Sequence, residues 1–235
     1  MNEKPPAVRG NASRVDAFLA EMTAVRQLKP APSLGRLIFA LDATASREPT
    51  WRWASRLQAQ MFEVAAEAGG LAIQLCYYRG FDGFETLPWH TTAQALRTEM
   101  ERIGCVSGYT QVDRVLRHAL AEHRRERVNA LVFIGDAWEE DEEPLFALAG
   151  QLGLQGVRVF MFQEGDDPGV ETVFRGIARL SGGAYARFDA GSPDRLARLL
   201  RAVAVYAAGG IRSMQALAGR GDAAIPELTR QLRQP

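Results

Sequence analysis

Short apolar runs recur along the chain and alternate with segments in which apolar residues return at helical spacing. The continuous runs predict strands over about 36–41, 71–78, 129–135, 157–162 and 184–188, with a short edge strand over 84–87. Continuous apolar residues are typical of strands that are buried on both faces. The intervening segments predict helices over about 50–68, 92–103, 142–152, 168–180 and 192–207, and one more that Thr110 begins.

This alternation predicts an α/β fold, a doubly wound, mostly parallel six-stranded sheet flanked by helices, with right-handed crossovers. In such sheets ligands bind beyond the carboxyl ends of the strands, at the point where the strand order reverses. We expect the strands that end at Asp42 and Asp136 to be neighbours at that point. The residues that follow these two strands are therefore the first candidates for a functional site.

The two ends of the chain differ in pattern from its middle. Residues 1–34 begin with a polar, proline-rich tail and continue as an amphipathic helix over 13–28. At 235 residues, one large domain is expected, and we predict it over 35–207. Residues 208–235 predict a C-terminal helical extension of two short helices, which dock on the domain or on a partner.

Oxygen-bearing side chains gather at the predicted strand ends. The first apolar run stops at Asp42, and hydroxyls follow at alternate positions in Thr44 and Ser46. A later apolar strand ends in Asp136, and Thr110 opens a helical segment between the two strands. Carboxylate and hydroxyl oxygens are hard ligands of the kind that Mg²⁺ prefers, so these residues predict a magnesium site.

In this order the residues resemble the von Willebrand factor A (VWA) domain. The metal-ion-dependent adhesion site (MIDAS) of that family has the form D-x-S/T-x-S, then a Thr in a loop, then an Asp after a later strand. The resemblance covers roughly residues 35–207 and implies a Rossmann-like VWA fold with metal ligands at Asp42, Thr44, Ser46, Thr110 and Asp136. The same side chains would also serve as loop caps and turn residues, and this alternative stays open.

The resemblance further implies that the cation, Mg²⁺ or Mn²⁺, keeps an open coordination position, which a carboxylate of a partner protein completes. Thr44 and Ser46 would bind the metal directly, and the other three ligands directly or through water. Soluble relatives often serve as partners of ATPase machines, so an ATPase is a candidate partner by analogy. The expected function is a metal-dependent protein–protein interaction module and not an enzyme.

Two other functions are compatible with these residues. A metal-dependent hydrolase could use the same oxygen cluster, although no general base beyond the ligands can be named. A structural subunit could carry a vestigial metal site and be held in its assembly by the terminal helices. The sequence contains no phosphate-binding glycine loop, dinucleotide fingerprint or G-x-S-x-G elbow, so nucleotide binding and esterase chemistry lack support.

Composition limits the classes of partner and the cellular compartment that we expect. Lys and Arg balance Asp and Glu at 28 each, so the overall charge does not favour nucleic acid as a partner. Cys76 and Cys105 are too few for a disulfide framework. The first residues lack the apolar core of a signal peptide, and no apolar stretch is long enough to span a membrane. We therefore expect a cytoplasmic protein.

Two further patterns have alternative interpretations. The acidic run over 139–143 is either the N-terminus of the following helix or an acidic rim that selects a basic partner surface. Four tryptophans come near the loops of the predicted site, where each is either an interface anchor or a packing residue. These are Trp51, Trp53, Trp89 and Trp138. The sequence does not decide between these interpretations.

The same stretch also contains a departure from the family pattern. A Gly often follows the last Asp of the MIDAS, whereas Ala137 and the bulky Trp138 follow Asp136 in this chain. This difference from the family pattern affects the expected path of the loop and the expected shape of the rim, but it leaves the ligand atoms unchanged.

Overall fold

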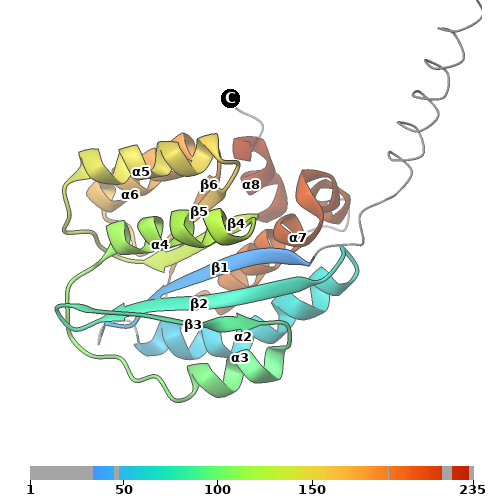
Figure 1. Cartoon of the computed structure of the whole chain (residues 1–235), viewed down its shortest axis with the longest axis horizontal. Helices are drawn as coiled ribbons and strands as arrows, with labels where there is room; N and C mark the ends of the chain where they lie inside the picture. Colours follow the sequence, from blue (N-terminus) through green and yellow to red (C-terminus); the bar gives the residue numbers. More distant parts are fainter. Residues whose placement is uncertain (1–33, 45–47, 190, 219–223, 233–235) are drawn as a thin grey trace, which may run out of the picture. The chain divides into compact units, whose positions relative to one another are not determined.

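In the computed structural model, which describes residues 34–44, 48–189, 191–218 and 224–232, six strands form one sheet. Their order is β3-β2-β1-β4-β5-β6 (Figure 1). The strands are β1 (Gly35–Asp42), β2 (Leu71–Arg79), β3 (Gly83–His90), β4 (Ala130–Gly135), β5 (Arg158–Glu164) and β6 (Ala184–Phe188). All neighbouring pairs are parallel except β2 with β3. The predicted mostly parallel six-stranded sheet is confirmed.

The antiparallel strand β3 lies at the edge of the sheet and is longer than the predicted strand over 84–87. It continues through Pro88 to His90. Proline lacks the amide hydrogen that a central strand would need, but an edge strand tolerates it because one side of its backbone has no neighbour.

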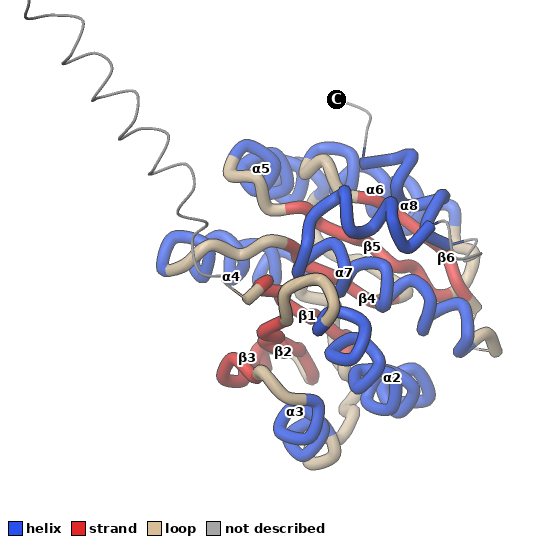
Figure 2. Tube along the Cα trace, turned by 90° about the vertical axis from the view of Figure 1, so that its right-hand side faces the viewer, coloured by secondary structure: helices blue, strands red, loops and turns tan. Residues whose placement is uncertain are grey.

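Helices cover both faces of the sheet, as Figures 1 and 2 show. They are α2 (Glu48–Ala66), α3 (Ala93–Met100), α4 (Val112–Arg125), α5 (Glu142–Leu154), α6 (Pro168–Leu180), α7 (Pro193–Ala218) and α8 (Ala224–Leu232). Apolar residues of α2, α3, α7 and α8 share one core cluster, and those of α4, α5 and α6 share the other. Among the described helices, none is both long enough and apolar enough to traverse a membrane.

The central strand β1 contributes to both of these clusters. Leu37, Phe39 and Leu41 belong to the first cluster, whereas Ile38 and Ala40 belong to the second. Successive side chains of a strand point to opposite faces, so a strand between two helical layers must be apolar at every position. This requirement explains the continuous apolar run that the sequence shows here.

The strand order reverses at β1. β2 and β4 flank β1, and both pair with it in parallel. In the β1–β4 register Leu41 lies opposite Ile134, so Asp42 and Asp136 follow neighbouring strands at the same edge of the sheet. The expectation that these two strands are neighbours is confirmed.

The C-terminal helices join the first of the two core clusters. α7 continues to Ala218 through a bend at Gly210, whose φ of 71° and ψ of −170° are not helical. Met214, Ile225 and Leu228 are fully buried in that cluster. The division of the chain at residue 207 stays a prediction, and the amphipathic helix predicted over 13–28 lies outside the described residues.

Both cysteines are free thiols. Cys76 is fully buried in β2, and burial raises the pKa of its thiol well above the ordinary value. Because the reactive form of cysteine is the thiolate, a buried thiol with a raised pKa is unreactive.

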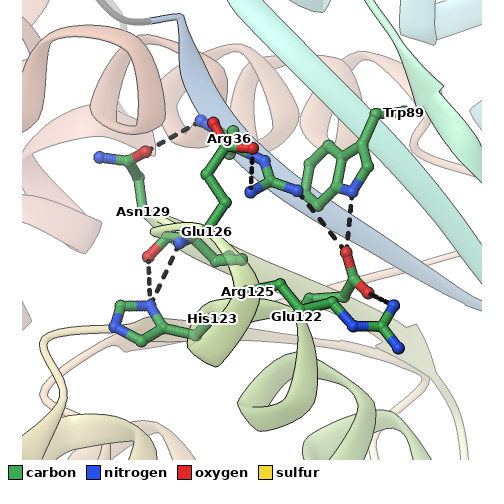
Figure 3. Close-up of polar contacts among 8 residues, drawn as sticks. Arg36, Trp89, Glu122, His123, Arg125, Glu126 and Asn129 are labelled. Carbon is green, nitrogen blue, oxygen red and sulfur yellow. Dashed lines mark hydrogen bonds and ion pairs between the residues drawn. The ribbon is translucent and has the colours of Figure 1, made fainter.

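A buried ionic network lies at the edge of the sheet opposite the two aspartates (Figure 3). The guanidinium of Arg36, near the start of β1, lies 3.8 Å from the centre of the Trp89 ring of β3. Glu122 of α4 accepts a hydrogen bond from the Trp89 indole N–H at 2.9 Å and lies 3.6 Å from Arg36 Nη2. Arg36 and Glu122 are both nearly inaccessible to solvent, so each charge needs a partner of opposite charge.

Backbone contacts extend this network to the start of β4. The amide of Arg36 donates to Asn129 Oδ1 at 2.9 Å, and the amide of Asn129 donates to the Arg36 carbonyl at 2.9 Å. Glu126 Oε2 lies 2.9 Å from Arg36 Nη1, and Arg125 donates to Glu122 Oε1 at 2.9 Å. We call Arg36, Trp89, Glu122, Arg125, Glu126 and Asn129 the Arg36 network. It attaches the C-terminal end of α4 to the sheet.

We expect Glu122→Ala to lower the free energy of unfolding by about 3 kcal/mol, because it strips a buried arginine of one of its carboxylates and leaves an indole N–H without an acceptor. Glu101→Ala is the matched control, since it removes an exposed ion pair with Arg97 and should cost less than about 1 kcal/mol. Urea unfolding followed by circular dichroism measures both. Equal losses in the two variants would show that the network contributes no more than a surface pair.

Candidate metal centre

The turn that follows β1 carries two of the predicted ligands. Asp42 is 3% exposed and Thr44 is 8% exposed. The amide of Thr44 donates to Asp42 Oδ1 at 2.7 Å, which closes a tight turn of the kind that Asp favours two residues before an amide. Ser46, the third member of the triplet, lies outside the described residues.

Asp136 is the first residue after β4 and is half-buried. It follows the strand that pairs with β1, so two carboxylates stand at adjacent strand ends. Two carboxylates in such an arrangement repel each other unless a cation or hydrogen-bond donors compensate them. A cation bound at these two strand ends would lower that repulsion.

The loop before α4 brings Thr110 to the same edge. The amide of Val106 donates to the carbonyl of Ala43 at 2.9 Å, so this loop is attached to the turn that holds Asp42 and Thr44. The amide of Tyr109 donates to the carbonyl of Gly80, just after β2, at 3.2 Å. Thr110 itself is only 6% exposed. The structure therefore brings the loop of Thr110 to the turn after β1.

Glu139 holds Thr110 from the side of β4. Its Oε2 accepts hydrogen bonds from the Thr110 amide at 2.6 Å and from the Thr110 hydroxyl at 2.7 Å. Glu140 Oε1 accepts from the amide of Asp113, in the first turn of α4, at 3.1 Å. Glu140 therefore caps α4, whereas Glu139 binds Thr110, the residue before the N-cap, and attaches its loop to the segment that follows β4.

This capping was not predicted from the sequence. Of the two interpretations of the acidic run, the N-terminus of the following helix applies to Glu142 and Glu143, which lie in the first turn of α5. Glu140 instead caps α4, whose own N-cap residue Gln111 makes no side-chain cap hydrogen bond, and Glu139 binds Thr110 just before that N-cap. Glutamine is a poor N-cap, so the missing cap at Gln111 is the signal that another segment must supply acceptors.

The arrangement suits a hard cation. The Thr110 hydroxyl donates its hydrogen to Glu139, and its oxygen lone pairs can then face a metal. In the part of the chain that the structure describes, no three His, Cys, Asp or Glu side chains are close enough to hold a metal. A cation at this edge would therefore depend on hydroxyl oxygens as well as on Asp42 and Asp136, which is the donor set that the D-x-T-x-S pattern predicts.

No family model matches the chain, and no curated protein matches it in sequence. Solved structures match it in fold. The VWA domain of SpRpn10 matches with a TM-score of 0.55 at 11% identity, over 70% of this chain and 95% of that one. The ArnB paralog VWA2 from Sulfolobus acidocaldarius matches with a TM-score of 0.50 at 14% identity, over 72% of this chain and 46% of that one. This chain has the VWA fold.

A third match, proximal thread matrix protein 1 from the mussel byssus, was solved with zinc in its MIDAS motif. Its TM-score is 0.58 at 14% identity, over 83% of this chain and 52% of that one. At such identities the likeness concerns the VWA fold alone. The case for a metal in this chain rests on its own residues.

Trp138, the bulky residue near Asp136, packs against the core on the side of α4, α5 and α6, and a side chain added at Gly169 would meet its ring. Two other tryptophans are also packing residues: Trp51 is 4% exposed and donates to the Met100 carbonyl, and Trp89 belongs to the Arg36 network. For these three, the packing interpretation is the one that the contacts support.

A close backbone contact positions the Thr110 loop in this VWA fold. A Cβ atom on Gly108 would overlap the backbone of Gly80, whereas a Cβ atom on Gly104 would meet nothing. We expect Gly108→Ala to lower the free energy of unfolding by about 1–3 kcal/mol by forcing the loop outward. Gly104→Ala, in the same segment, should change it by less than about 0.5 kcal/mol. Thermal melts compare the two, and equal stability of the variants would contradict this role of Gly108.

Proposed function

We propose that this VWA-fold protein binds one divalent cation, Mg²⁺ or Mn²⁺, and that the cation binds a carboxylate of a partner protein. Asp42, Thr44, Thr110 and Asp136 would hold the metal together with Ser46. The observation that carries the proposal is the attachment of the Thr110 loop to the ends of both β1 and β4, through Val106 and Glu139. Segments far apart in the sequence bring hard oxygen atoms to one edge of the sheet, as a cation site requires.

Mg²⁺ is the first candidate because it keeps several waters and needs few protein carboxylates. An ion with two carboxylates and otherwise neutral ligands retains an electrophilic position, and a carboxylate from another molecule is the natural group to fill it. The zinc found in the mussel protein makes Zn²⁺ a necessary comparison in any binding experiment. The identity of the cation is thus part of the test.

A protein is a better candidate partner than a small molecule. One hollow of about 400 Å³ lies between α2 and α3, and one of about 860 Å³ lies between α2 and α7. Neither is lined by Asp42, Thr44, Thr110 or Asp136. Small ligands are usually enclosed in such hollows, whereas a partner protein can meet a cation on an open edge.

We further propose that the protein acts as an interaction module without catalytic activity, and that it works in the cytoplasm. Its free thiols are compatible with a reducing compartment. The resemblance to soluble VWA proteins makes a component of an ATPase machine one partner to examine first.

Calorimetric titration with Mg²⁺, Mn²⁺ and Zn²⁺ tests the metal site. We expect wild type to bind one cation and Asp42→Asn to bind it at least about tenfold more weakly, because the amide loses the charge but keeps an oxygen acceptor for Thr44. The matched control is Asp166→Asn, an exposed carboxylate after β5 at the same edge of the sheet. Equal affinity of wild type and Asp42→Asn would exclude this metal site and leave the fold with a structural role.

Glu139 offers a second test, because it positions Thr110 without being one of the predicted ligands. Removing a group that orients a metal ligand typically weakens metal binding by about 10–100-fold. We expect Glu139→Ala to weaken Mg²⁺ binding within that range, whereas Glu142→Ala, an exposed acid of the same run, should leave it nearly unchanged. If both variants lost affinity equally, the effect would be the loss of general negative charge and not the orientation of Thr110.

A further inference from the structure

Two aromatic side chains stand exposed beside the candidate metal centre. Phe81 is 70% exposed and Tyr109 is 56% exposed, and their rings meet edge to face with centres 5.2 Å apart. Val106, in the same loop as Tyr109, is 50% exposed. We call Phe81, Val106 and Tyr109 the aromatic rim. Exposed apolar side chains are common singly, whereas an exposed pair of aromatic rings in contact is a feature of binding surfaces.

The aromatic rim is continuous with the proposed site. Tyr109 directly precedes Thr110. The backbone amide of Val106 donates a hydrogen bond to the carbonyl of Ala43, which lies between Asp42 and Thr44. Phe81 lies in the turn after β2, the strand that neighbours β1. A partner that reached a cation at the end of β1 would therefore touch the aromatic rim as well.

Hydrogen bonds hold the hairpin that carries Phe81. Tyr77 donates to Glu85 Oε2 at 2.7 Å across the strands, and Arg79 donates to Glu85 Oε1 at 3.1 Å. The hydrogen bond from Tyr77 lowers the pKa of Glu85, while burial is the main cause that raises the pKa of Tyr77 to about 12. Arg114 of α4 donates to the carbonyl of Asp82 at 2.8 Å. A surface held in this way loses little entropy on binding.

The opposite flank of the site is acidic. Glu139, Asp141, Glu142 and Glu143 are exposed in the segment after β4, and residues 128–157 contain no Lys or Arg. From β2 to β4, the edge of the sheet therefore presents an apolar surface, then the candidate cation position, then a negative surface. This order defines the chemistry of a complementary segment.

We propose that the aromatic rim is the docking anchor of the partner, and that the partner presents an extended segment with three features in order. These are a large apolar side chain, an Asp or Glu that completes the metal, and a Lys or Arg. Neighbouring strands lie about 4.8 Å apart, and an extended chain advances about 3.3 Å per residue, so the apolar residue falls within about three positions of the acid. The inference rests on the proposed metal-dependent function and names its partner.

The first experiment selects binders from a library of random 12-residue peptides displayed on phage, using the full chain in the presence of Mg²⁺ and elution with EDTA. We expect enrichment of an acidic residue with a Trp, Phe, Leu or Met within three positions on one side and a Lys or Arg on the other. Selection on Asp42→Asn runs in parallel. If no acidic residue is enriched, or if EDTA releases nothing, the metal-dependent function itself is wrong.

The second experiment titrates a synthetic peptide of the selected sequence by fluorescence anisotropy. We expect Phe81→Ala and Tyr109→Ala each to weaken its binding about tenfold or more, as aromatic anchors typically do. Leu154→Ala is the matched control, because Leu154 is 92% exposed at the far end of α5 and should have no effect. A peptide with Ala at its apolar position should bind wild type and Phe81→Ala equally weakly.

The outcomes separate the anchor from the metal site. If the peptide needs Mg²⁺ and its acidic residue, but Phe81→Ala and Tyr109→Ala bind it as wild type does, the metal site stands and the aromatic rim is not the anchor. Both variants alter exposed side chains, so their melting temperatures should equal that of Leu154→Ala. A lower melting temperature in either would be followed by Phe81→Leu or Tyr109→Leu, which keep an apolar side chain and should retain most of the affinity.

Discussion

The parallel pairing of β1 with β4 is the constraint on which the rest of the molecule depends. β1 is buried along its whole length between two helical layers, and it pairs with β2 on one side and β4 on the other. A slip of one residue would turn every side chain of β1 to the wrong layer. The apolar core therefore sets the register that places Asp42 and Asp136 at neighbouring strand ends, although neither residue contributes to that core.

Helix α4 runs between the end of the sheet that carries Asp42 and Asp136 and the opposite end, where the Arg36 network lies. At its start, Glu140 supplies the acceptor that Gln111 does not, and Glu139 binds the preceding Thr110. Near its end, Glu122 binds Arg36 and Trp89. The position of Thr110 therefore depends on its hydrogen bonds to Glu139 before the start of α4 and on the Arg36 network near the end of α4. A metal site needs its ligand oxygens held in fixed positions, because a misplaced oxygen adds little to the binding of the metal.

The fold could be predicted from the sequence because it depends on local patterns, and the same patterns supply the candidate ligands, which stay a prediction. Continuous apolar runs identify buried parallel strands, and the residues after those strands must lie at one edge. The same patterns failed to identify Glu139 and Phe81 because neither has a local signature of its role. In the local pattern, Glu139 is an acid before a helix and Phe81 is a turn residue. Three of the four tryptophans, which the sequence left as anchor or packing residues, are packing residues.

By itself the sequence determined the six strands, their alternation with helices, and the meeting of Asp42 and Asp136 at neighbouring strand ends. These follow from hydrophobic burial and from chain connectivity, which act through residues near one another in sequence. Only the tertiary structure decided which acid caps α4, that β3 continues through Pro88, and that Phe81 meets Tyr109 in solvent. Those outcomes depend on contacts between segments far apart in the chain, where small distances select one partner among several of equal chemistry.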